Sequence, residues 1–230
     1  MPRPLQPPAI ARAVTGSLAV TALDAALLAL ALGGVEALLV HGRALALLAI
    51  GFVGGAVLAL VRPVRTHDPQ ATSAEPKLAF VALFVLPLLV PPVAALGERL
   101  QVFPWFARPA IEWVGVALVA LGLGIRIVAM ATLGSRFSPI VAVQKGHALE
   151  TRGIYARVRH PGYLGSALAC AGGMLAFGSA LALPLVLLFG GLIRQRIARE
   201  ERVLAEHFGD AYRRYRDRTG ALLPTVRRGP

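Results

Sequence analysis

Long apolar runs, separated by short polar segments, dominate the chain. Four of these runs are long enough, or nearly so, to cross the bilayer as single helices, since ~20 apolar residues span about 30 Å of hydrocarbon. They are Ser17–Val40, Ala44–Val61, Leu78–Gly97 and Ala110–Leu133. The pattern therefore predicts four membrane-spanning helices in the first part of the chain.

A fifth apolar region, residues 163–193, is divided near Gly178 and Ser179 into two pieces that are each shorter than the other runs. We expect a tight helical hairpin, packed through its small residues, whose last helix continues out of the membrane. These small residues are Ala167, Ala171, Gly172 and Gly173. The chain is thus predicted to be an all-α polytopic membrane helix bundle of about six helices, the last two a short hairpin, with a C-terminal cytoplasmic helical cap.

Composition supports a membrane protein. Hydrophobic residues make up 56% of the chain and charged residues only 16%, and the mean hydropathy is +0.65. A soluble domain of this length would have to hide that apolar area in one core. The proline-rich segment Met1–Arg12 is expected to be an irregular tail, and prolines 87, 91 and 92 are expected to kink or break the third span.

The net charge of +12 indicates orientation rather than nucleic-acid binding, because the basic residues flank apolar runs. If the N-terminus is cytoplasmic, only Arg43, Arg99 and Arg108 lie in outer loops. The positive-inside rule then places both termini in the cytoplasm. The sizeable polar segments, residues 134–161 and 194–230, are both on that side, so any chemistry is expected there.

The abundance of alanine and arginine hints at a GC-rich bacterial genome, and hence at a bacterial inner membrane. Cys170 is the single cysteine and lies inside an apolar run. It has no partner for an internal disulfide, and a cysteine-pair metal site is excluded. No metal is predicted.

The first polar segment is dense in groups that bind polar ligands. Gly153 and the Pro161-Gly162 pair bend the backbone, and Tyr155 and Tyr163 offer aromatic faces to an adenine ring or a sulfonium cation. His147 and His160 can supply hydrogen-bond donors or acceptors near neutral pH. The alternative is an interfacial anchor, since aromatic residues and arginines also gather at lipid headgroups.

The second polar segment places Arg196 and Glu200 on one helical face, because they are four residues apart. They are either part of a ligand site or a surface ion pair worth a few tenths of a kcal/mol.

Two phrases resemble the signature of isoprenylcysteine carboxyl methyltransferases and related integral-membrane methyltransferases. The first is Gly153-x-Tyr155-x-x-x-Arg159-His160-Pro161-x-Tyr163-x-Gly165, and the second is Glu200-Glu201-x-x-Leu204-x-x-x-Phe208-Gly209-x-x-Tyr212-x-x-Tyr215. Their order around a short apolar hairpin is specific. The resemblance separates a methyltransferase-like region, residues 110–230, from residues 1–109, which carry spans without a recognisable motif.

The resemblance implies an S-adenosylmethionine cofactor and places Arg196 close to the substrate, so that Arg196 and His160 are the candidate catalytic residues. The residues it implies for cofactor binding are Gln144, His147, Ala148, Leu149, Glu150, Tyr155, His160, Pro161, Gly162, Tyr163 and Glu200. Two positions depart from the family pattern. Gln144 lies two residues beyond the family's usual glutamine, and Glu150 stands where the family has an apolar residue.

The expected function is S-adenosylmethionine-dependent methyl transfer to a lipophilic or small hydrophobic acceptor at the cytoplasmic membrane face, with membrane lipids as surroundings. A carboxylate acceptor such as a prenylcysteine needs no general base, whereas an amine or thiol would need one, for which His160 or Glu201 are candidates. The alternatives are an NADPH-dependent membrane reductase resembling sterol reductases, and a non-catalytic transporter or scaffold.

Overall fold

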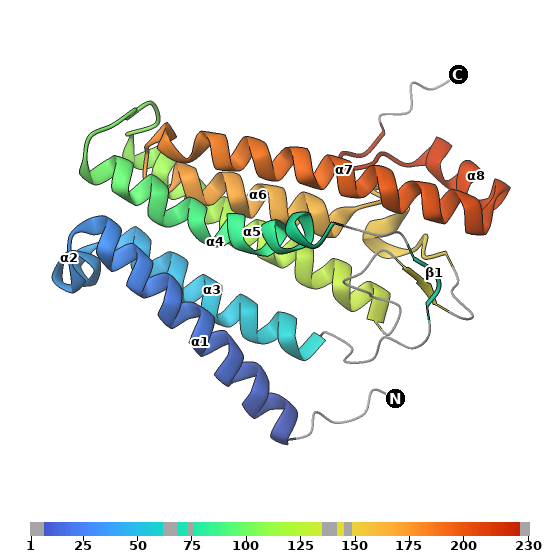
Figure 1. The fold of residues 1–230 in the computed structure, drawn as a ribbon, viewed down its shortest axis with the longest axis horizontal. Coiled ribbons are helices and arrows are strands. Elements are labelled where there is room, and N and C mark those ends of the chain that lie inside the picture. The colour runs from blue at the N-terminus through green and yellow to red at the C-terminus, as the bar shows by residue number, and fades with distance from the viewer. Residues whose placement is uncertain (1–6, 62–68, 73–75, 135–141, 145–148, 226–230) are drawn as a thin grey trace.

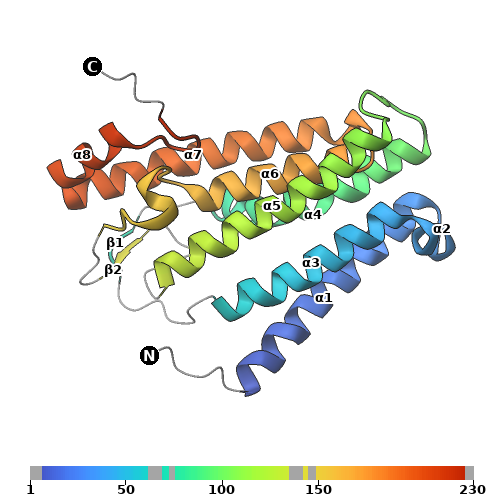
Figure 2. The same cartoon turned by 180° about the vertical axis from the view of Figure 1, so that it is seen from behind.

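The computed structural model describes residues 7–61, 69–72, 76–134, 142–144 and 149–225, and these form a bundle of long helices (Figure 1, and from behind in Figure 2). In chain order the helices are α1 (Pro7–Leu32), α2 (Val35–Val40), α3 (Gly42–Val61), α4 (Lys77–Arg99), α5 (Pro109–Leu133), α6 (Pro161–Leu175), α7 (Leu183–Phe208) and α8 (Asp210–Arg218), with short 3-10 turns η2 (Gly153–Ala156) and η3 (Ala180–Ala182).

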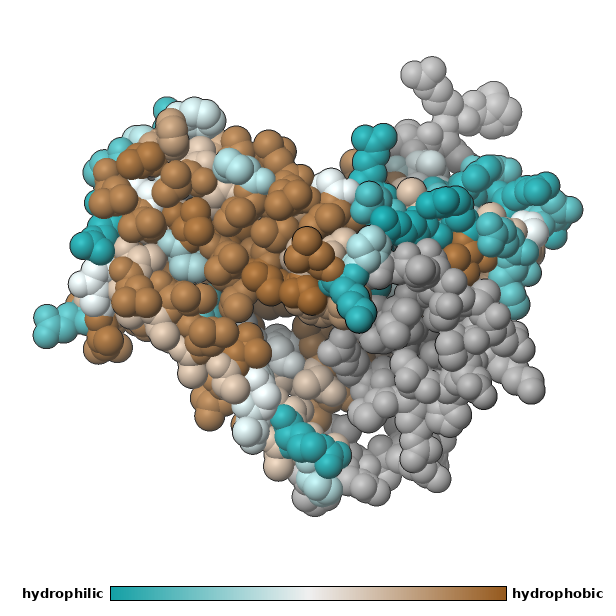
Figure 3. All heavy atoms as spheres, viewed as in Figure 1, coloured by the Kyte–Doolittle hydropathy of each residue, from teal (hydrophilic) through white to brown (hydrophobic). Residues whose placement is uncertain are grey.

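The bundle has the composition of an integral multi-pass membrane protein. Among the described residues, five helical segments are long and apolar enough to cross a membrane: Pro8–Leu32, Gly42–Val61, Lys77–Arg99, Pro109–Leu133 and Ala180–Phe208. Hydrophobic side chains cover most of the molecule on one side of the view, and hydrophilic side chains gather at the opposite end, around α8 (Figure 3).

Successive long helices run in alternating directions between two ends, with α2 at one end and α8 and β1 at the other (Figures 1 and 2). α6 is only 15 residues long, which is about 22 Å of helix, and it lies alongside α5. The predicted polytopic membrane helix bundle is confirmed.

The first span differs from its prediction at both ends. α1 begins at Pro7 rather than Ser17, because prolines are compatible with the first turn of a helix, where no N–H bond is lost. It ends before Gly33 and Gly34, whose φ angles of 105° and 141° lie outside the helical region. Residues 35–40 therefore form the separate helix α2.

Two other expectations about irregularity have different outcomes. Pro87, Pro91 and Pro92 do not end α4, which continues through them from residue 77 to 99. The break near Ser179 is present, and the Ser179 hydroxyl accepts a hydrogen bond from the Leu181 amide at 3.2 Å while donating to the Val102 carbonyl at 2.7 Å. α7 continues for 26 residues, as the sequence predicted for a last helix that extends beyond the apolar hairpin.

The small residues of α6 pack mainly against α5, not against its hairpin partner α7 as the sequence suggested. A Cβ on Gly172 would lie 2.6 Å from the Gly115 carbonyl oxygen, and one on Gly173 would lie 3.1 Å from the Pro91 ring of α4. Backbones can approach this closely only where side chains are missing. The α5–α6 contact therefore holds the first turn of α6 beside the C-terminal half of α5.

The end of the bundle that carries α2 is held by charged groups. Arg43, at the start of α3, donates to Glu98 of α4 at 2.5 Å and is also ion-paired with Glu112 of α5. His41 lies 3.2 Å from Glu98. These side chains are 12–24% exposed, so α3, α4 and α5 are joined by partly buried ion pairs at this end.

At the opposite end, β1 (Pro69–Thr72) pairs antiparallel with β2 (Ala142–Gln144). The sequence analysis predicted helices alone, and this pair is too short to show a strand pattern. It connects the segment between α3 and α4 to the segment between α5 and α6.

The α5–α6 approach can be tested with two glycines on α5. We expect Gly122→Ala to lower stability by about 1–3 kcal/mol, because its Cβ would overlap the Gly165 carbonyl oxygen and lie 2.8 Å from the Ala169 nitrogen. Gly124→Ala is the matched control, because a Cβ there meets no atom within 4 Å and should be neutral or stabilising by up to ~1 kcal/mol. Thermal unfolding in detergent measures both, and equal melting temperatures would contradict the described packing.

Candidate functional site

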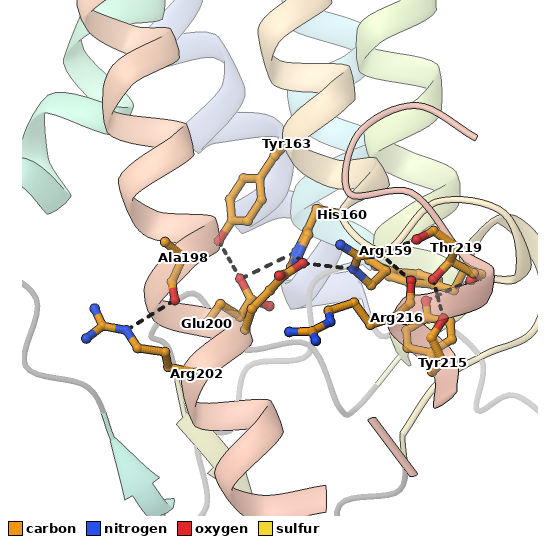
Figure 4. A network of polar contacts seen from close by, with 11 residues as sticks. Arg159, His160, Tyr163, Ala198, Glu200, Arg202, Tyr215, Arg216 and Thr219 are labelled. Carbon is orange, nitrogen blue, oxygen red and sulfur yellow. Dashed lines mark hydrogen bonds and ion pairs between the residues drawn. The ribbon is translucent and has the colours of Figure 1, made fainter. Parts of the chain in front are cut away.

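The candidate site lies where the first turn of α6 faces the polar half of α7, next to the loop of residues 149–160 and α8 (Figure 4). α6 begins at Pro161 directly after His160, since proline is favoured in a first helical turn and ends the preceding loop. α7 continues beyond its apolar half into a run rich in arginine and glutamate. The polar face of α7 is thereby placed against the start of α6.

The hydroxyl group of Tyr163 connects the two helices. It donates a hydrogen bond to Glu200 Oε2 at 2.9 Å and accepts one from Arg196 Nε at 2.6 Å. Arg196 is only 6% exposed. A buried guanidinium and a carboxylate one helical turn apart are thus bridged by one tyrosine, which orients both.

His160 lies between the two adjacent glutamates of α7. Its Nε2 is 3.2 Å from Glu201 Oε1, and its Nδ1 is 3.9 Å from Glu200 Oε2. The imidazole is buried, with 3% of its side chain exposed. His160 is therefore within reach of both carboxylates.

Arg159 connects this cluster to α8. Its Nε donates to Glu201 Oε1 at 2.8 Å, and its Nη1 donates to the carbonyls of Arg216, at 3.1 Å, and Thr219. A cation beside the last carbonyls of a helix is favourable, because those carbonyls lack partners within the helix. Arg159 therefore fixes the end of α8 to α7.

The segment after α8 also pairs with the backbone before α6. The Arg159 amide donates to the Gly220 carbonyl at 2.9 Å, and the His160 amide donates to the Ala221 carbonyl at 3.0 Å. His160 is therefore positioned by residues that precede α6 in the sequence and by residues that follow α7.

Tyr155 and Tyr215 hold the loop in place. The Tyr155 hydroxyl donates to the Ala129 carbonyl at 3.4 Å, and the Tyr215 hydroxyl donates to the Tyr155 carbonyl at 2.7 Å. Burial raises the pKa of Tyr155 and raises the pKa of Tyr215 to about 12, although the positive charge of Arg159 opposes the shift at Tyr215. Both hydroxyls therefore stay protonated and act as donors.

Glu150 is buried at 6% exposure. Its Oε1 accepts hydrogen bonds from the Arg152 amide at 3.1 Å and from the Arg152 Nε at 3.0 Å. The neighbouring Leu149 is partly buried. Glu150 thus stabilises the turn that leads into η2.

The predicted site residues fall into three groups. Six of the predicted residues come together at the α6–α7 contact: His160, Pro161, Gly162, Tyr163, Arg196 and Glu200. Leu149, Glu150 and Tyr155 lie in the adjacent loop, and Gln144 is in β2, which lies against α7. His147 and Ala148 are outside the described residues.

Some participants were not predicted. Glu201 was predicted only as a candidate base, and Arg159 was named only as a member of the first sequence motif. In the structure these two residues together join α7, α8 and His160. Their adjacency to Glu200 and His160 was the available signal. The carbonyls of Thr219, Gly220 and Ala221 gave none, because backbone acceptors have no sequence signature.

Comparison with known proteins gives an independent result for the same region. The model of the isoprenylcysteine carboxyl methyltransferase (ICMT) family matches residues 114–206. A protein-S-isoprenylcysteine O-methyltransferase of Schizosaccharomyces pombe is 37% identical over 114 residues, which cover 48% of each chain. The corresponding Saccharomyces cerevisiae protein is 29% identical over 176 residues, covering 74% of this chain and 73% of the yeast protein.

A solved structure agrees in fold. The eukaryotic intramembrane Ras methyltransferase ICMT superposes with a TM-score of 0.54 at 25% identity, covering 80% of this chain and 66% of that one. The present chain is ICMT-like. The ICMT-like chain spans about half the length of several curated relatives it matches, including 51% of the Homo sapiens protein. The match to residues 114–206 includes the α6–α7 contact described above.

The clamp formed by Arg159 can be tested by its removal. Arg159→Met should lower stability by about 1–3 kcal/mol, because Glu201 and two carbonyls at the end of α8 lose a buried donor. Arg213→Met is the control, since its ion pair with Asp210 is exposed and such pairs contribute ~0–1 kcal/mol. Unfolding in detergent and amide exchange of residues 216–221 report the difference; unchanged exchange in Arg159→Met would refute the clamp.

Proposed function

We propose that this chain is an S-adenosylmethionine-dependent methyltransferase that methylates a lipophilic acceptor, with a prenylcysteine-like carboxylate favoured, at the cytoplasmic face of the membrane. The observation that carries the proposal is the Arg196–Tyr163–Glu200 chain of hydrogen bonds. It brings a buried cation and a carboxylate together at the polar end of an apolar bundle. The names of the relatives, protein-S-isoprenylcysteine O-methyltransferases, support the same reaction class.

The residues present fit a cationic nucleoside cofactor. Glu200 retains 33% side-chain exposure beside the almost buried His160, so its carboxylate is accessible to an ammonium group or to ribose hydroxyls. Tyr163 adds an aromatic face. The residues proposed to surround the cofactor are Gln144, His147, Ala148, Leu149, Glu150, Tyr155, His160, Pro161, Gly162, Tyr163 and Glu200. The bound cofactor would supply an electrophilic methyl group on a sulfonium; the acceptor attacks the methyl carbon in line, and the C–S bond breaks so that the demethylated cofactor leaves as a neutral thioether.

Arg196 is proposed to orient the acceptor. A guanidinium binds a carboxylate through two parallel hydrogen bonds, and burial strengthens that contact. Because a carboxylate is already a nucleophile at neutral pH, transfer to it requires positioning and exclusion of water rather than proton removal. His160, held between Glu200 and Glu201, then has an electrostatic and positioning role. An amine or thiol acceptor would instead require it as a base.

The membrane location supports a lipophilic acceptor. Hydrophobic side chains cover one part of the molecule, whereas hydrophilic side chains gather at the end that carries α8 (Figure 3). An acceptor with a lipid tail and a polar end would be soluble in the first region and react at its boundary. We propose that both termini lie in the cytoplasm, on the distribution of basic residues. We propose a bacterial inner membrane on the abundance of alanine and arginine in the chain.

Ligand binding tests the cofactor. We expect S-adenosylmethionine, or its demethylated product, to raise the melting temperature of the purified protein by about 5–10 °C at a hundredfold excess over Kd, since such an excess contributes ~2.7 kcal/mol. The protein should also transfer a labelled methyl group to an S-farnesylcysteine derivative that has a free carboxylate. The methyl ester of the same derivative should not react. Stabilisation by NADPH alone would favour a reductase, and stabilisation by neither compound would favour a transporter or scaffold.

Glu200 has its own test. Glu200→Gln removes the charge but keeps the size, so we expect the Kd of S-adenosylmethionine to rise about 10- to 100-fold, as for a lost hydrogen bond to a charged group. Glu206→Gln removes a charge from an exposed position on the same helix and should leave that Kd within about twofold. Isothermal titration measures both; an unaltered Kd in Glu200→Gln would remove Glu200 from the cofactor site.

A further inference from the structure

An aromatic side chain from α4 lies against the guanidinium of Arg196. Arg196 Cζ is 5.7 Å from the ring centroid of Phe80 and 5.9 Å from that of Tyr163. Both distances are within the range of cation–π attraction. Phe80 belongs to the first turns of α4, in the part of the chain for which the sequence offered no recognisable motif.

The two rings and the Tyr163 hydroxyl constrain Arg196 in different ways. The hydroxyl binds the guanidinium through Nε at 2.6 Å, which fixes one edge. A ring attracts the cation through its π face and uses none of its N–H groups. An aromatic contact therefore restricts the orientation of the guanidinium without occupying donors that a carboxylate needs.

This contact also compensates for burial. Arg196 is 6% exposed, and a charge withdrawn from water needs compensating interactions. A cation–π contact gains strength when it is desolvated. Since Phe80, Tyr163 and Arg196 come from α4, α6 and α7, three helices set the position of one guanidinium.

We propose that Phe80 is a positioning residue of the acceptor site: its ring holds the Arg196 guanidinium in the orientation that receives the acceptor carboxylate. The inference rests on the proposed methyltransferase function and extends it to α4. Phe80 acts through Arg196 and does not bind the cofactor. The expected consequence of its loss is a defect toward the acceptor with normal cofactor binding.

The test uses Phe80→Leu, which keeps an apolar side chain and removes the ring. With an S-farnesylcysteine derivative as acceptor, we expect kcat/KM for the acceptor to fall about 3- to 30-fold, the span of a lost cation–π contact. The Kd of S-adenosylmethionine should remain within about twofold. Phe80→Tyr, which restores a π face, should recover most of the activity. A purely structural role would instead lower the melting temperature and the affinity for S-adenosylmethionine together with kcat/KM.

Phe84→Leu is the matched control. Its ring packs on Phe80 at 5.1 Å between centroids, and it is 48% exposed on the same helix. It should leave kcat/KM within about twofold. Unchanged acceptor kinetics in Phe80→Leu, or an equal loss in Phe80→Leu and Phe80→Tyr, would overturn the proposal. If the unaltered protein binds no S-adenosylmethionine and transfers no methyl group, the proposed function itself fails, a result distinct from an active enzyme indifferent to Phe80.

Discussion

The hydrogen bonds between the start of α6 and the polar half of α7 determine the arrangement of the candidate site. Tyr163 contacts Glu200 and Arg196, and His160 contacts Glu201. At the boundary of an apolar bundle, each of these groups would be costly to leave unpaired. Their mutual satisfaction fixes the rotation of α7 about its axis, because residues 196 and 200 must face α6 together.

This requirement explains why a short α6 is joined to a long α7. α6 needs only to pack beside the apolar part of α5, whereas α7 must extend further to present its charged residues to the loop and α8 (Figure 1). The glycines of α6 contribute by allowing close contact with α5. The apolar packing and the polar cluster therefore position the same first turn of α6 from opposite sides.

Much of this architecture could be predicted from the sequence, because crossing a bilayer demands long apolar runs and leaves polar residues at the ends. The two phrases around the last hairpin contain His160, Tyr163 and Glu200, and the family resemblance implied Arg196. The structure brings these four residues together. Their roles in binding, and the division of the chain at residue 110, stay predictions.

Other features depended on information that a single sequence lacks. Small residues on α6 marked a packing face but not the neighbouring helix, so α5 was missed as the partner of Gly172. The pair Gly33-Gly34 ended α1 within an uninterrupted apolar run, where composition gave no boundary. The contact of Phe80 with Arg196 joins residues far apart in the chain, and no local pattern encodes such a pair.

The ion pairs of Arg43 with Glu98 and Glu112 lie at the end of the bundle remote from the α6–α7 cluster. They act as a pivot for any tilting of α3 against α4 and α5. Displacement about a pivot grows with distance from it, so over a helix of 25 residues such as α5, or about 38 Å, a tilt of about 5° moves the far end by roughly 3 Å. Any such tilt would therefore move the helices most at the end where the polar cluster lies.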